Sequence, residues 1–202
     1  MRYGYAGTIL RADLSNEVVR REPLPDVLVE NFIGGRGFVA KMLYDEIPRS
    51  IEPYDPENML IAATGPLTGH FLPASGKTHF GTKSPASGGY ADSNMGGHFG
   101  PALKFAGYDA LVLTGASEAP CYLFIDDDKV EIRSAESYWG MGALTAEKRL
   151  KEDLGEAFQV VTIGPAGENL VTYACIGSEA YRQMGRGGAG ALFGAKNLKA
   201  IA

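Results

Sequence analysis

Two stretches of this sequence share one pattern and decide the expected fold. Residues 96–111 read Gly-Gly-His-Phe-Gly-Pro-Ala-Leu-Lys-Phe-Ala-Gly-Tyr-Asp-Ala-Leu, and residues 187–201 read Gly-Gly-Ala-Gly-Ala-Leu-Phe-Gly-Ala-Lys-Asn-Leu-Lys-Ala-Ile. With one residue deleted, each stretch becomes a Gly-rich turn, a short helix and a strand. The repeat indicates an internally duplicated domain with two similar halves related by a pseudo-twofold axis. The alternative is convergence, because Gly-rich turns before helices are common.

Hydrophobic patterning around these stretches predicts an α+β domain. Strands are expected at residues 7–14, 18–21, 59–63, 78–82, 108–114, 121–125, 130–133, 159–163, 170–176 and from 198 onward, and helices at residues 28–32, 39–47, 101–106 and 144–154. Strands and helices alternate irregularly and several strands form hairpins, which favours α+β over a doubly wound parallel sheet. We expect residues 1–202 to form one domain.

Composition excludes several classes of function. A formal net charge of −5 argues against nucleic acid and anionic membranes as main partners, because both require clustered Lys and Arg. The two cysteines, Cys121 and Cys175, lie in apolar runs and support neither a disulfide framework nor a Cys-ligated metal. No stretch approaches the roughly 18 apolar residues of a transmembrane helix. We therefore expect a soluble protein of a reducing cytoplasm.

Glycine is unusually abundant and gathers in a few places. It accounts for 27 of 202 residues, well above the roughly 7% of an average protein, and concentrates at residues 34–37, 65–69, 88–100 and 185–194. Unpaired N–H groups at a Gly turn before a helix bind phosphate without any net basic charge. The first glycine turn (residues 95–100) and the second glycine turn (residues 185–190) together suit a ligand with two phosphates. Arg182 and Arg186 flank the second turn as further donors, unless they are merely solvated or salt-bridged.

Several other patterns carry little weight. Gly35-Arg36-Gly37 resembles a fragment of a dinucleotide fingerprint, but a helix is expected before it and no complete G-x-G-x-x-G is present. The second glycine turn lacks the Lys-Ser/Thr ending of a P-loop. The three histidines, at positions 70, 79 and 98, are not spaced as metal ligands, and no catalytic triad can be assembled.

Longer phrases are more specific than any single Gly motif. They are residues 65–69 (Gly-Pro-Leu-Thr-Gly), 82–85 (Thr-Lys-Ser-Pro), 103–109 (Leu-Lys-Phe-Ala-Gly-Tyr-Asp), 163–169 (Ile-Gly-Pro-Ala-Gly-Glu-Asn) and 185–190 (Gly-Arg-Gly-Gly-Ala-Gly). In this order they resemble the amino-terminal domain of the aldehyde ferredoxin oxidoreductase family, over essentially the whole chain. The resemblance implies two similar α+β halves whose sheets form a base under a tungsten or molybdenum bis-molybdopterin cofactor, with magnesium joining the pterin phosphates.

The same resemblance assigns roles to individual residues. Asn94 and Gly96 of the first turn, and Arg182, Gln183, Gly185 and Arg186 of the second, would contact the pterins, and the backbone carbonyls of Asn94 and Gln183 would lie near magnesium. Lys77 departs from the family's tungsten aldehyde enzymes, which carry there an Arg that links a pterin to the iron–sulfur cluster. Lysine keeps the charge but loses the planar fork of donors, so either a single hydrogen bond persists or the substrate differs.

The resemblance also implies an activity for the intact protein. Members of the family oxidise aldehydes to carboxylic acids under anaerobic conditions and pass electrons through a [4Fe–4S] cluster to ferredoxin, and we expect a homodimer or larger assembly. The cluster ligands and the acid–base residues lie in two further helical domains, so we expect a longer protein and no catalytic residue within residues 1–202. The substrate stays open, because relatives with this base act on other acids and thioesters. The alternatives are a free-standing pterin-binding or scaffold subunit and a nucleotide-binding module, for which a complete fingerprint is missing.

Overall fold

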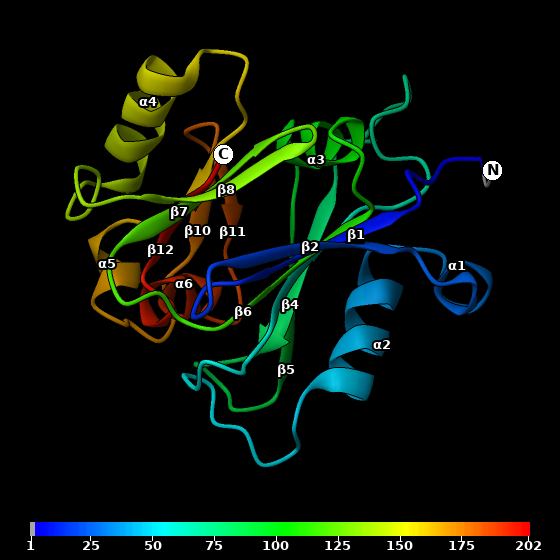
Figure 1. Ribbon diagram of the computed structural model, residues 1–202, viewed down its shortest axis with the longest axis horizontal. Helices are drawn as coiled ribbons and strands as arrows, with labels where there is room; N and C mark the ends of the chain where they lie inside the picture. Colours follow the sequence, from blue (N-terminus) through cyan, green and yellow to red (C-terminus); the bar gives the residue numbers. More distant parts are fainter. Residues whose placement is uncertain (1–2) are drawn as a thin grey trace.

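The computed structural model describes residues 3–202 and contains two six-stranded sheets with helices packed on them (Figure 1). The first sheet consists of β1 (Thr8–Asp13), β2 (Val18–Pro23), β3 (Leu60–Ala63), β4 (Thr78–Lys83), β5 (Tyr90–Met95) and β6 (Ala110–Thr114). The second consists of β7 (Cys121–Asp126), β8 (Lys129–Ser134), β9 (Val161–Thr162), β10 (Ile176–Ser178), β11 (Arg182–Met184) and β12 (Leu198–Ile201). The helices are α1 (Asp26–Phe32), α2 (Arg36–Glu46), α3 (Phe99–Phe105), α4 (Ala143–Leu154), α5 (Pro165–Glu168) and α6 (Ala189–Ala195).

The two sheets have the same topology. The first runs β2-β1-β6-β3-β4-β5, and the second, read from the matching end, runs β8-β7-β12-β9-β10-β11. In each sheet one pair is parallel, β1 with β6 and β7 with β12, while every other pair is antiparallel. Helix α3 joins β5 to β6 as α6 joins β11 to β12. This correspondence confirms the predicted α+β class and the two similar halves.

Side chains alternate between the two faces of each sheet, so the inner faces share one core and each outer face has its own. On the first sheet, Leu10 and Leu111 face a central core that both sheets share, and this core includes Phe99 of α3 and Phe193 of α6. The next residues along those strands, such as Val112, face the opposite way and pack against α1 and α2. Helix α4 covers the outer face of the second sheet in the same manner. The helices α2 and α4 therefore lie on opposite outer sides of the molecule (Figure 1).

Most predicted elements are present within a few residues of the expected bounds, but one predicted strand is wrong. Residues 170–176 do not form a strand, and β10 begins only at Ile176. Leu170 adopts a φ of +56°, which ends extended structure there. The backbone N–H of Ala174 then bonds Val171 O at 2.8 Å, and Ala174 O accepts from Gly190 N at 3.0 Å. These local and helix-start bonds replace those of a sheet.

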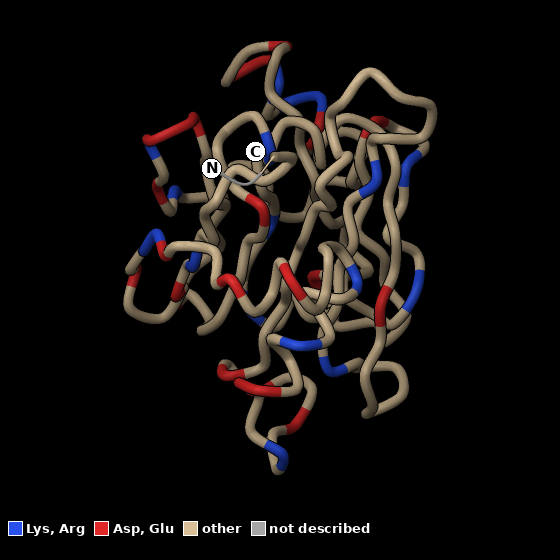
Figure 2. The backbone as a smooth tube through the Cα atoms, turned by 90° about the vertical axis from the view of Figure 1, so that its right-hand side faces the viewer, with Lys and Arg blue, Asp and Glu red and all other residues tan. Residues whose placement is uncertain are grey.

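Three further elements were not predicted from the sequence: β5, β11 and the four-residue helix α5. Among residues 3–202, no helix is long and apolar enough to span a membrane; the longest, α4, has 12 residues. Acidic and basic positions are interspersed along the backbone in Figure 2, in keeping with the small net charge of −5.

Candidate functional site

The two glycine turns follow the edge strands β5 and β11, which contact each other across the junction between the halves. Asn94 pairs with His79 in the first sheet, and Gln183 pairs with Gly177 in the second. Each amide residue is followed by a buried methionine, Met95 or Met184, and then by a glycine. Asn94 and Gln183 therefore occupy equivalent positions, and the structure brings together the two turns that the repeat predicted.

The predicted cofactor-binding residues share one property, which is that they face solvent. Gly96 is partly buried. The other six are exposed: Lys77, Asn94, Arg182, Gln183, Gly185 and Arg186. Within the part of the chain that the structure describes, the side chains of Lys77, Arg182 and Arg186 form no ion pair or hydrogen bond. Three unpaired cations beside two Gly turns make an electropositive surface suited to phosphate groups.

The turns themselves differ in how their N–H groups are used. In the first turn, a carboxylate oxygen of Glu179 accepts the His98 N–H, and its other oxygen lies 3.2 Å from His98 Nδ1. Gly97 has a φ of +100°, a conformation that favours glycine, and the carboxylate of Glu179 lies against it. In the second turn, the N–H groups of residues 185–188 donate to no described group. The expectation of two equivalent anion-binding turns is thus only half met, because a side chain already occupies part of the first.

Helices α3 and α6 have seven residues each, so their dipoles add little to anion binding. Glycine is required in the second turn as well, because a Cβ on Gly188, whose φ is +73°, would lie 2.0 Å from Thr172 O. The hydrogen-bond donors that this face offers are therefore the turn N–H groups and the neighbouring cations, rather than long helix dipoles.

A hollow lies beside each turn, and the two hollows are equivalent. The first, about 380 Å³, lies between the start of α2 and the residues Lys77, His79 and Asn94. The second, about 320 Å³, lies between the start of α4 and the residues Gly177 and Gln183. Helix α4 corresponds to α2 in the repeat, as Gly177 corresponds to His79 and Gln183 to Asn94. The site is therefore a pair of pockets related by the internal pseudo-symmetry.

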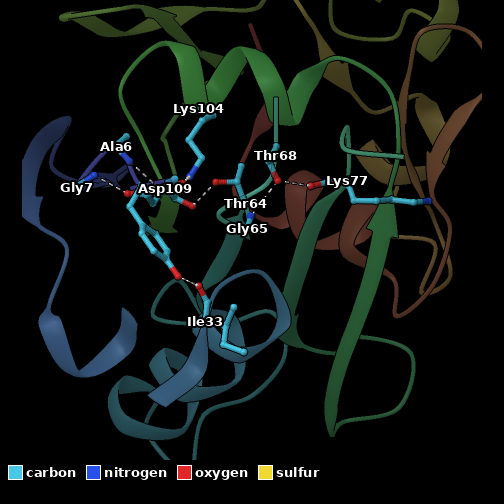
Figure 3. Close-up of polar contacts among 11 residues, drawn as sticks. Ala6, Gly7, Ile33, Thr64, Gly65, Thr68, Lys77, Lys104 and Asp109 are labelled. Atoms are coloured by element: carbon cyan, nitrogen blue, oxygen red, sulfur yellow. Dashed lines mark hydrogen bonds and ion pairs between the residues drawn. The ribbon is translucent and has the colours of Figure 1, made fainter. Parts of the chain in front are cut away.

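Hydrogen bonds fix the floor of the first pocket (Figure 3). The Thr68 hydroxyl accepts the Gly65 N–H at 3.0 Å and donates to Lys77 O at 3.4 Å. Thr64 donates from both its N–H and its hydroxyl to Asp109 O, at 2.9 and 3.1 Å. The Lys77 side chain extends away from this cluster, so its ammonium group is free to meet a ligand (Figure 3).

Sequence reasoning missed the contribution of residues 34–36, which it set aside as an incomplete dinucleotide fingerprint. A helix does precede this turn, as expected, but the turn lines the first pocket at the start of α2. Gly35 N donates to Thr64 O at 2.9 Å, which brings the turn against the loop after β3. The Gly-Pro phrases at residues 65–66 and 164–165, which follow β3 and β9, were the signal that could have located these pockets.

The fold and the site define a class: an internally duplicated α+β domain with two equivalent pockets, each beside a glycine turn. The chain belongs to the aldehyde ferredoxin oxidoreductase family, because the model described as "Aldehyde ferredoxin oxidoreductase, N-terminal domain" matches residues 9–202. This match confirms the resemblance that the sequence phrases carry.

Individual relatives agree with the family. The tungsten-containing aldehyde ferredoxin oxidoreductase of Pyrococcus horikoshii is 45% identical over 98% of this chain and 33% of its own length. An aliphatic sulfonate oxidoreductase WOR-like subunit of Pyrococcus furiosus is 38% identical over 98% of this chain and 34% of its own. The solved active site complex BamBC of benzoyl coenzyme A reductase superposes with a TM-score of 0.96 at 42% identity, covering 100% of this chain and 31% of that one. This chain thus spans about a third of the length of the relatives it matches.

Proposed function

We propose that this domain binds the two pterins of a tungsten cofactor, one beside each glycine turn. The observation that carries the proposal is the pair of equivalent pockets, one bearing Asn94 and the other Gln183. The unpaired Lys77 lines the first pocket, and the unpaired Arg182 and Arg186 lie next to and within the second glycine turn. Two related ligand groups fit two related pockets. The site fits such a cofactor in a second respect, because the N–H groups of residues 185–188 in the second turn donate to no described group.

Within this proposal the chain's residues bind and orient rather than react. Arg182 and Arg186 would hold phosphate oxygens through forked N–H donors, and the free N–H groups of residues 185–188 would add to them. Lys77 would contribute a point charge at the first pocket, and the backbone carbonyls of Asn94 and Gln183 would face magnesium between the phosphates. When bound, the cofactor supplies the two-electron redox chemistry.

For the intact protein we propose oxidation of an aldehyde and water to a carboxylate, with two electrons leaving through a [4Fe–4S] cluster to ferredoxin. The names of the relatives support separating cofactor binding from substrate choice. One is an aldehyde enzyme, one an aliphatic sulfonate oxidoreductase and one a benzoyl coenzyme A reductase complex, yet each matches this chain nearly from end to end. A base common to such different substrates is best explained by a common cofactor.

The test is to produce the full-length gene product anaerobically with tungstate and to measure tungsten and pterin in the purified protein. We expect both to be bound, with aldehyde-dependent reduction of ferredoxin. A protein without tungsten–pterin would overturn the proposed function. A protein that holds the cofactor but oxidises no aldehyde would keep the cofactor role and redirect the search to another substrate, or to a binding subunit without catalysis.

The role of the second turn predicts the effect of one substitution. Arg186→Met should lower cofactor retention on the order of tenfold or more, because one charge-assisted hydrogen bond to phosphate contributes about 1.5–3 kcal/mol. Arg20→Met is the matched control, since Arg20 is equally exposed and lies on β2, outside the two pockets. Tungsten per chain, measured after gel filtration, reports the difference. Equal tungsten in the two variants would remove Arg186 from the site.

A further inference from the structure

The side-chain amide of Asn94 is held from behind by a buried histidine. His79 is 4% exposed, and its Nδ1–H donates to Asn94 Oδ1 at 2.8 Å. The amide oxygen is thereby committed, whereas the Asn94 NH2 group meets no described partner. Asn94 itself is exposed at the mouth of the first pocket. The histidine therefore leaves only hydrogen-bond donors of this amide facing a ligand.

A carboxylate lies beside the other ring nitrogen of this histidine. His79 Nε2 lies 3.0 Å from Asp92 Oδ2, within ion-pair distance but off the line of a hydrogen bond. The same carboxylate oxygen accepts from Arg36 Nε at 2.6 Å and from the Tyr90 hydroxyl at 3.1 Å. Burial and Asp92 raise the pKa of Tyr90 to about 12, so the phenol keeps the proton that it donates. A connected series of polar contacts thus runs from the start of α2 to the first glycine turn.

The second half reaches the same arrangement with different residues. Gln183 is the equivalent of Asn94, and its amide oxygen lies 2.6 Å from the Cys175 thiol. Its NH2 group, like that of Asn94, has no partner among residues 3–202. At the position equivalent to His79 stands Gly177, so the imidazole belongs to the first half alone. In both amides an unrelated side chain therefore takes the oxygen, and the NH2 group has no described partner.

We propose that His79 is a positioning residue for the first glycine turn: it takes the Asn94 amide oxygen and so directs the Asn94 NH2 group toward an anionic or carbonyl oxygen of the bound cofactor. This inference rests on the proposed function, because the ligand is the cofactor named there. Asp92, held by Arg36 and Tyr90, keeps the imidazole in place. The thiol of Cys175 does the equivalent work for Gln183.

The experiment compares two amide substitutions in the anaerobically produced full-length protein. His79→Asn places an amide nitrogen near the position of Nδ1 and can still donate to Asn94, whereas His79→Gln places it near Nε2 and cannot. We expect tungsten per chain to fall on the order of tenfold in His79→Gln, because loss of a residue that orients a ligand-binding residue usually weakens binding by at least that factor. In His79→Asn we expect it to stay near the wild-type value. His70→Gln is the control, since His70 is exposed and its ring contacts no described residue.

The coupling between His79 and Asn94 and the folding of each variant are measured separately. In an Asn94→Ala background, His79→Gln should cause no further loss of tungsten, because the histidine acts through the asparagine. Thermal unfolding of each apoprotein shows whether it folds. Equal tungsten in His79→Gln and wild type overturns the inference, and so does an equal loss in His79→Asn and His79→Gln, which would mean that the ring matters for packing. Wild-type protein without tungsten overturns the proposed function itself.

Discussion

Lys196 is a buried lysine without a close carboxylate partner among the described residues. Its side chain is 1% exposed, and Nζ donates to Pro56 O and Gly115 O, both at 2.8 Å. Burial lowers its pKa from 10.5 to about 7, against the opposing influence of Glu57 and Asp13. Between these two values the unfolded chain binds a proton that the folded chain has lost. The free energy of unfolding must therefore rise with pH from about 7 to 10.5 on account of this residue.

Replacement of this lysine should flatten that dependence. In Lys196→Met, the rise in the free energy of unfolding between pH 7 and pH 9 should be smaller by about 2 kcal/mol, because one pKa unit corresponds to about 1.4 kcal/mol. Lys148→Met, at a site with 80% side-chain exposure, should leave the pH dependence unchanged. Urea unfolding at the two pH values measures both. An identical pH slope in Lys196→Met and wild type would show that Lys196 keeps its ordinary pKa.

Site residues next to a local motif could be predicted from the sequence, whereas those brought in by strand pairing could not. Arg182 and Arg186 adjoin the second glycine turn, so a local pattern points to them, whereas Asn94, Gly96, Gln183 and Gly185 are assigned only by the family resemblance. His79 becomes relevant only because β4 pairs with β5, which brings it to Asn94 across 15 positions. The turn at residues 34–36 reaches the pocket through α2 in the same nonlocal way. Contacts that depend on register leave little trace in a single sequence.

At the scale of elements, α5 and α6 approach each other through glycines. A Cβ on Gly194 would lie 2.0 Å from Gly167 O, and one on Gly167 would lie 2.7 Å from Gly190 O. Gly194→Ala would stabilise an unhindered helix by about 1 kcal/mol, but here the overpacking should destabilise the fold by roughly 1–3 kcal/mol. The control Gly89→Ala meets nothing within 4 Å. The urea midpoint of unfolding shows whether Gly194→Ala stabilises or destabilises the fold. A stabilised variant would contradict this close packing.

The strands missed by prediction are those with the weakest apolar pattern. In β5, only Ser93 and Met95 are buried, and β11 is three residues long with two of them exposed. Both are edge strands, for which polar faces are the rule. Residues 170–176 fail in the opposite sense: the segment is apolar, but Ala174 O accepts from Gly190 N at the start of α6 rather than from a strand, and Leu170 and Tyr173 are exposed. The glycine turns were found while the strands leading into them were not, because glycine is a stronger local signal than a short polar strand.

At the scale of the whole molecule, the duplication extends to buried charge with the sign reversed. Thr64 N bonds Asp109 O in the first half as Ile163 N bonds Lys199 O in the second, which makes Asp109 and Lys199 equivalent. Asp109 is neutralised by Lys104, and Lys199 by Glu168, and both central residues have no exposed surface. Each half therefore pairs its buried central charge with an opposite charge, but that central charge is negative in the first half and positive in the second.

The two halves should nevertheless unfold together. They share one central core. Two hydrogen bonds of 2.8 Å also connect the halves, one from Lys196 Nζ to Pro56 O and one from the Ser84 hydroxyl to Gly187 O. Phe80 lies in the first half of that core with no exposed surface, while the single tryptophan, Trp139, lies in the second half.

Phe80→Ala should consequently lower the urea midpoint reported by Trp139 fluorescence as much as the midpoint reported by circular dichroism. The expected loss is about 3–5 kcal/mol, the usual cost of emptying a buried phenylalanine site. Phe71→Ala, at a fully exposed position, should change neither signal. If Trp139 kept its wild-type midpoint in Phe80→Ala, the halves would be independent folding units. A cofactor held between them would then join two modules, rather than rest on the single base that the shared core predicts.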